Sequence, residues 1–212
     1  MFGYTLAHWS TFFVAAIFLK LSPGPDIAFI LAQTARHGQS SGFAAMFGIW
    51  GGAFLHVLLA AVGLSAILAT SATAFIFVKW VGAIYLIWLG IQAFRSNGIS
   101  YSSDTEAEQS SNLEIFQQGV LVATLNPKVA IFFLAFLPQF VVVGAGPASA
   151  QLFLHGALII VVAAFIEPPL VIPGSKLTRY LGQNPNVAAW MDRGLGTLFS
   201  GLETRLALSE RA

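Results

Sequence analysis

Two ionisable residues lie next to prolines inside long apolar stretches of the chain. Asp26 directly follows Pro25, and Lys128 directly follows Pro127. A charged side chain in an apolar environment is unfavourable by roughly 2.5–3.5 kcal/mol on membrane-insertion scales, unless it is paired or hydrated. Together the two side chains could bind a zwitterion, with Asp26 taking an ammonium group and Lys128 a carboxylate. The alternative is a permanent ion pair that only supports the structure.

Other ionisable residues in or beside apolar stretches include Glu167, His56, Lys20 and His8. Glu167 precedes a double proline. If it is buried, its protonated form is favoured, which makes it a candidate proton carrier. The interpretation that we favour places it in water at the end of its stretch. His56 is expected to pack and to donate a hydrogen bond to a helix carbonyl, with a proton relay as the alternative. Lys20 is expected to pair with an acidic group or to reach water, and His8 to be solvated.

The composition assigns the chain to the integral membrane proteins. Of its 212 residues, 57% are hydrophobic and 9% are charged, and the mean hydropathy is +0.78. Soluble proteins contain roughly 45–50% apolar and about 25% charged residues, so this chain has too few charges to cover a water-exposed surface. Its net charge of +1 gives no positive field for nucleic acid.

The residue types also exclude several kinds of chemistry. The chain has no cysteine, which excludes disulfides, thiolate metal sites and a cysteine nucleophile. Its four histidines are scattered, and no phosphate-binding glycine loop or catalytic set such as His-Glu-x-x-His is present. We therefore expect no metal, no cofactor and no enzyme activity.

Six segments are candidates to cross a bilayer, which takes about 20 mostly apolar residues. They are residues 6–31, 42–68, 75–94, 115–143, 148–166 and 187–208. The sixth is the weakest, because Asp192, Arg193, Glu203 and Arg205 leave only a short uncharged middle, and a helix lying in the interface is the alternative. Lys and Arg lie mainly in the odd-numbered loops, which are therefore expected to be cytoplasmic, with both termini outside if six helices cross.

An internal repeat divides the chain into two halves within one transmembrane domain, 1–212. Ser22-Pro23 and Asn126-Pro127 lie 104 residues apart, and each interrupts the first segment of a set of three. Repeat one covers about 1–95, a polar linker 96–114, and repeat two about 115–212. Because three is odd, the second copy is inverted, and such repeats with a broken first helix indicate a secondary transporter site near the midplane. The alternative is a pair of proline kinks that only shape the bundle.

Small residues recur on one face of the second segment. Ala44, Gly48 and Gly52 are spaced four apart, a spacing that allows helices to approach closely. We expect this face to pack against another helix, within the protomer or between two protomers.

In its motifs the chain resembles the LysE-type amino-acid exporters, the lysine exporter and homoserine/threonine efflux family. The resemblance covers nearly the whole chain and rests on Ser22-Pro23-Gly24-Pro25-Asp26 and on the segments 42–52, 82–90, 116–138 and 201–208. It implies an all-α, multi-pass protein of the bacterial cytoplasmic membrane that exports amino acids or close derivatives. It also implies energy from the proton gradient or membrane potential, and a homodimer as one form of the protein.

The resemblance further implies which residues line the substrate site. They are Pro23, Gly24, Pro25, Asp26, Asn126, Pro127 and Lys128. Glu167 and His56 are the candidates for coupling transport to protons, and the alternative function is an ion or metal-ion permease that uses Asp26 and Glu167. A site with one Asp and one Lys suits a neutral zwitterion better than lysine or arginine, which would need a second carboxylate. Glu167 could be that carboxylate.

Overall fold

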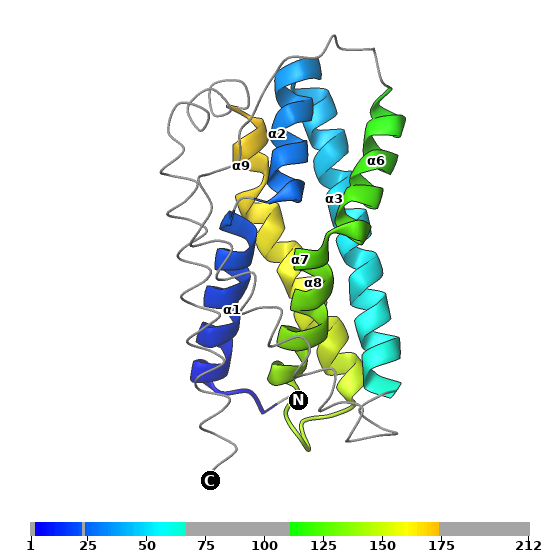
Figure 1. The fold of residues 1–212 in the computed structure, drawn as a ribbon. Coiled ribbons are helices and arrows are strands. Elements are labelled where there is room, and N and C mark those ends of the chain that lie inside the picture. Colours follow the sequence, from blue (N-terminus) through cyan, green and yellow to red (C-terminus); the bar gives the residue numbers. More distant parts are fainter. Residues whose placement is uncertain (1–2, 23, 67–110, 174–212) are drawn as a thin grey trace, which may run out of the picture.

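The computed structural model describes residues 3–22, 24–66 and 111–173, and all regular structure in this part of the chain is helical (Figure 1). The α-helices are α1 (Leu6–Leu21), α2 (Pro25–His37), α3 (Gln39–Leu59), α6 (Asn112–Leu125), α7 (Pro127–Ile131), α8 (Ala148–Ile166) and α9 (Pro168–Val171). Two π-helical segments, Ala60–Leu64 and Phe132–Phe136, continue α3 and α7, and a 3-10 helix, Leu137–Phe140, follows the second.

The described helices include two to four candidate membrane spans. Gln39–Leu64 and Ala148–Val171 are each long and apolar enough to cross a bilayer. Leu6–Leu21 with Pro25–His37, and Asn112–Leu125 with Pro127–Phe140, pass the same test as pairs, bent by 47° and 50°. These four match the first, second, fourth and fifth predicted segments. The third and sixth, 75–94 and 187–208, lie outside the described residues, as does most of the polar linker.

The two bends occur at the predicted proline motifs, which confirms that the first and fourth segments are broken helices. Pro25 and Pro127 are each the first residue of the second half-helix. At this position a helix needs no N–H group, and the fixed φ of proline suits the helical conformation. Gly24 caps α2 in an extended conformation, and the Asn126 side chain caps α7 by accepting a hydrogen bond from the backbone N–H of Lys128 at 3.0 Å.

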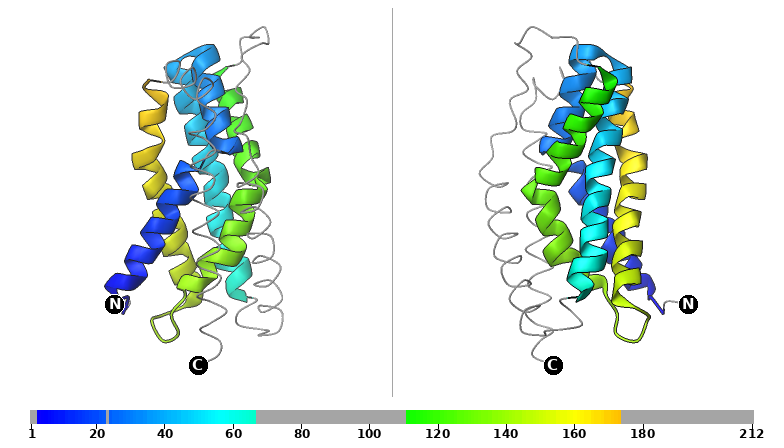
Figure 2. Two further views of the ribbon diagram at one scale, coloured as in Figure 1. Left: turned by 60° about the vertical axis from the view of Figure 1, so that its left-hand side comes forward. Right: turned by 90° about the vertical axis from the view of Figure 1, so that its right-hand side faces the viewer.

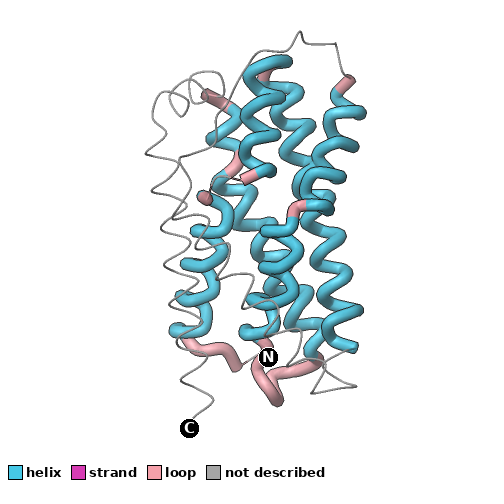
Figure 3. Tube along the Cα trace, viewed as in Figure 1, coloured by secondary structure: helices cyan, strands magenta, loops and turns pink. Residues whose placement is uncertain are grey.

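The two broken spans run in opposite directions, and their breaks lie side by side. Figures 1 and 2 show α1 leading upward into α2, and α6 leading downward into α7. Short non-helical segments mark both breaks in the interior of the bundle (Figure 3). Opposite directions are what an inverted repeat requires of its first helices; the complete three-helix repeats remain a prediction.

Close packing of α3 on α6 explains the small residues of the second span. A Cβ atom at Gly52 would lie 2.5 Å from the carbonyl oxygen of Val120, and one at Gly119 would lie 2.7 Å from that of Ala45. Glycine allows the two backbones to approach this closely because it has no side chain. At Gly48 and Gly52 the small-residue face therefore packs within the protomer.

Polar contacts join α8 to α1 and to the residues just before α1. Tyr4 donates a hydrogen bond to Gln151 at 3.0 Å, and the Nε2 atoms of His8 and His155 lie 2.9 Å apart. Both contacts join residues 147 apart, so the two segments run parallel. His8 is partly exposed, so the prediction of a solvated His8 holds only in part: its ring stacks on Tyr4 and faces the buried His155.

Candidate functional site

A small cavity lies between the two breaks, with free space of about one water molecule. All of its lining elements meet in the middle of the bundle, so residues distant in sequence share one wall. The cavity is lined by Leu19, Lys20, Ser22, Gly24, Asp26, Ile27, Ala53, Asn126, Lys128, Val129, Phe133, Ile159 and Glu167. It therefore brings together five of the nine residues predicted to bind substrate or to couple transport to protons, Gly24, Asp26, Asn126, Lys128 and Glu167.

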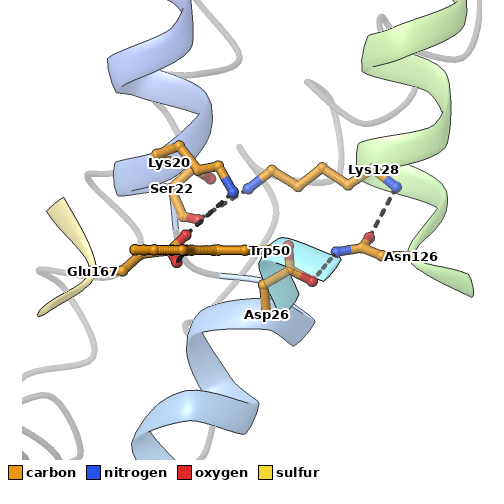
Figure 4. A network of polar contacts seen from close by, with 7 residues as sticks. All are labelled: Lys20, Ser22, Asp26, Trp50, Asn126, Lys128 and Glu167. Atoms are coloured by element: carbon orange, nitrogen blue, oxygen red, sulfur yellow. Dashed lines mark hydrogen bonds and ion pairs between the residues drawn. The ribbon is translucent and has the colours of Figure 1, made fainter. Parts of the chain in front are cut away.

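Asp26 and Lys128 reach this cavity from opposite broken helices, and each binds an uncharged group there (Figure 4). The Asp26 carboxylate accepts a hydrogen bond of 2.7 Å from the Asn126 side-chain amide. The Lys128 ammonium donates one of 2.9 Å to the carbonyl oxygen of Ser22, beside the last residue of α1. This places positive charge at the negative end of the α1 helix dipole, which is favourable.

Two further charged side chains, Lys20 and Glu167, line the cavity, and Trp50 binds Glu167. Lys20 and Glu167 form an ion pair at 3.2 Å, with relative side-chain exposures of 7% and 1%. The Lys20 ammonium contacts Oε1 of Glu167, and the indole N–H of Trp50 donates to Oε2 (Figure 4). The predicted pairing of Lys20 with an acidic group is therefore present in the structure.

The favoured position of Glu167 in water is wrong. The fifth span continues through Pro168 to Val171, so Glu167 lies within it and not at its end. The double proline opens α9, and proline at the start of a helix does not force the chain to leave the membrane. A reading of Pro168-Pro169 as the start of a new helix could have found this from the sequence.

The other predicted residues occupy supporting positions. His56 packs against Phe133, with its Nε2 atom 3.3 Å from the carbonyl oxygen of Ala123, as the favoured interpretation of this residue predicted. It is not among the residues that line the cavity. Pro25 and Pro127 open the half-helices and are exposed, while Pro23 lies outside the described residues.

Sequence reasoning missed the contributions of Ser22, Trp50 and the apolar wall. Ser22 contributes a backbone carbonyl, which any residue could supply. Trp50 lies in a span without charged residues, and nothing in its neighbourhood indicates a carboxylate partner. Ala53, Phe133 and Ile159 form apolar wall and resemble the other apolar residues of their spans.

The described residues contain no group of three or more His, Cys, Asp or Glu side chains suited to a metal ion. The cavity instead presents two ammonium groups and two carboxylates, with polar amide and carbonyl groups between them. Such an arrangement can bind a small molecule that carries both signs of charge.

Membrane helices broken around a small polar cavity are typical of secondary transporters. The chain belongs to the LysE family, because residues 17–210 match the LysE type translocator model. The resemblance identified from the sequence motifs is thereby confirmed, and the protein is a membrane protein of a transporter family.

Curated relatives match over nearly their whole length. The homoserine/homoserine lactone efflux protein of Salmonella typhimurium is 29% identical over 208 residues, which is 98% of this chain and 100% of the relative. The leucine efflux protein of Klebsiella pneumoniae is 28% identical over 200 residues, 94% of each chain. An uncharacterized membrane protein of Pseudomonas aeruginosa is 30% identical over 201 residues, 93% of each chain. No solved structure matches the chain.

Proposed function

We propose that the protein is a secondary exporter of amino acids or closely related small metabolites in the bacterial cytoplasmic membrane. The observation that carries this proposal is the cavity at the two adjoining helix breaks, where Asp26 and Lys128 present opposite charges. Membership of the LysE family and the efflux activities named for two relatives support the direction of transport.

In this proposal the substrate binds as a zwitterion between the two breaks. Its ammonium group binds the Asp26 carboxylate and its carboxylate binds the Lys128 ammonium. Both protein groups now contact uncharged partners, the Asn126 amide and the Ser22 carbonyl. Replacing a neutral partner by an opposite charge strengthens a hydrogen bond, so the substrate can displace these contacts.

The broken spans provide the flexible points for alternating access. Each break separates two half-helices that diverge by about 50°, and the breaks run through the cavity wall. We propose that the half-helices tilt at the breaks, so that the cavity opens to one side of the membrane at a time.

Export against a gradient requires an energy source, and we propose exchange for protons. Of the two coupling candidates, Glu167 has both carboxylate oxygens bonded, to Lys20 and Trp50, and His56 lies outside the cavity wall. Glu167 therefore has a cationic neighbour, which favours its charged form over a proton. We therefore place the exchange at Asp26, where one carboxylate can bind either a proton or the ammonium group of the substrate.

The alternative of an ion or metal-ion permease receives less support. A cation in this cavity would share it with the ammonium groups of Lys20 and Lys128, and like charges in a medium of low dielectric constant repel strongly. An amino acid avoids this repulsion because its carboxylate accompanies its ammonium group.

Purified protein in liposomes tests the proposal. Liposomes loaded with radiolabelled leucine or homoserine should lose label faster than protein-free liposomes, and an inward proton gradient should accelerate the loss. Absence of efflux for a panel of amino acids, or a gradient-driven flux of Na⁺ in their place, would contradict it. Crosslinking in the native membrane would show whether the exporter is a homodimer.

A further inference from the structure

Lys20 pairs with a carboxylate, Glu167, that would otherwise be available to bind the substrate. Glu167 lines the same cavity as Asp26 and is 1% exposed. Its Oε1 atom pairs with the Lys20 ammonium at 3.2 Å, and its Oε2 atom accepts a hydrogen bond from Trp50. The cavity therefore contains a second carboxylate whose oxygens are both engaged by the protein itself.

The balance of charge in the cavity decides which side chains a substrate can carry. Two lysines and two carboxylates line it, so their formal charges cancel. A zwitterion adds one positive and one negative charge and leaves the balance unchanged. A basic amino acid brings an additional ammonium group, and a charge without a partner in such surroundings is strongly unfavourable.

We propose that Lys20 substitutes for the side chain of a basic amino acid and thereby restricts the site to amino acids with uncharged side chains. This inference rests on the proposed function, since it assigns a substrate class to the same site. The remaining wall agrees with it, because Ala53, Phe133 and Ile159 are apolar. They offer an uncharged side chain a surface that requires no polar partner.

The parent protein gives the first test, in liposomes that contain either labelled leucine or labelled lysine. Leucine should be exported, and excess lysine should not compete with it. Equal export of lysine and leucine would overturn the inference and leave the proposed function intact. Export of neither, nor of any other amino acid, would overturn the proposed function.

Lys20→Met gives the second test, because it frees Glu167 to accept a side-chain ammonium group. The ratio of lysine to leucine export should rise about 10-fold or more, as expected for a hydrogen bond to a charged group. An unchanged ratio in folded Lys20→Met protein would overturn the inference.

Two matched variants separate this effect from a general loosening of the site. Lys20→Arg keeps the positive charge and should continue to exclude lysine. The double variant Lys20→Met/Glu167→Gln lacks both charges, which removes the unpaired buried carboxylate, and it should not gain lysine export. A gain in the double variant would contradict the role assigned to Glu167. If Lys20→Met does not fold, Lys20→Gln is used in its place, because glutamine retains a hydrogen-bond donor for Glu167. The same rise in the ratio of lysine to leucine export is expected.

Discussion

Asn126 determines how the charges of the two broken helices are arranged. It is 3% exposed, and its side-chain amide donates to Asp26 while its side-chain oxygen accepts from the backbone N–H of Lys128. The amide is therefore held from both sides and orients the Asp26 carboxylate. Asp26 and Lys128 line the same cavity, and the hydrogen bonds given above join each of them to an uncharged group.

Substitution of either charged residue should strongly reduce transport and spare the fold. Asp26→Asn retains an oxygen that can accept from Asn126, and Lys128→Met loses only a bond to a backbone carbonyl. We expect a loss of amino-acid efflux of about 10- to 150-fold from each, because each removes a charge-assisted contact of ~1.5–3 kcal/mol to the substrate. Efflux from liposomes measures this, and size-exclusion chromatography in detergent checks the fold.

The double variant distinguishes binding from structural support. If the two charges mainly compensate each other, neutralising both should remove the uncompensated charge and restore function. Recovery of efflux in Asp26→Asn/Lys128→Met would therefore contradict a role in substrate binding.

At the residue scale the sequence predicts which residues of the two helix breaks meet in the cavity. Asp26, Asn126 and Lys128 are marked by the prolines beside them, since a charge next to a helix break in an apolar stretch has few structural explanations. The pairing of Lys20 with Glu167 is different, because it joins residues 147 apart. It depends on the register of α1 along α8, and no local pattern in either helix fixes that register.

The contact between α3 and α6 shows how close packing supports the cavity at the scale of helices. Gly48 faces the backbone of Phe116 and Gly119, and a Cβ atom there would overlap the Phe116 carbonyl oxygen. The same two helices carry Trp50, Ala53 and the approach to Asn126. A separation of the helices would therefore displace one side of the site.

Gly48→Ala should destabilise the folded protein, whereas Gly63→Ala should not. The first substitution forces two backbones apart, and overpacking of this kind costs about 1–3 kcal/mol. Within the described part of the chain nothing lies within 4 Å of a Cβ atom at Gly63, and alanine is preferred over glycine in a helix by about 0.5–1 kcal/mol. Thermal unfolding in detergent compares the two. Equal melting temperatures would contradict the close α3–α6 contact.

The positions of the helix breaks were predicted correctly, but the fifth span was predicted too short. Proline after Gly24 and Asn126 predicts an interruption because it removes a backbone donor and clashes with the preceding turn. The same reasoning ended the fifth span too early, at Glu167. There the chain passes from α8 into α9 without leaving the bundle, because the buried partners of Glu167 make this position favourable within the membrane.

At the scale of the whole molecule, the described helices divide the loops between two sides. Residues 3–5 and the loop 141–147 lie at one end of the bundle (Figure 1). Gln151 joins them, because its side-chain oxygen accepts hydrogen bonds from Tyr4 and from the backbone N–H of Val142. The turn at Gly38 and the start of α6 lie at the other end, joined by Ser41 and Asn112. Arg36 lies at this second end, and residues 141–147 contain no Lys or Arg. The positive-inside rule therefore predicts that the second end lies in the cytoplasm.

Reporter fusions test this orientation. A fusion at Ser103, in the polar linker that precedes α6, should show the activity of a reporter that works only in the cytoplasm. A fusion at Gly146 is the matched control and should show the activity of one that works only outside, because its loop lies at the opposite end of the bundle. Exchange of these two results would reverse the inferred topology and the direction in which a proton gradient drives export. A fusion after Ala212 then counts the spans, since six place the C-terminus outside with the N-terminus, and five, with the last helix in the interface, place it inside.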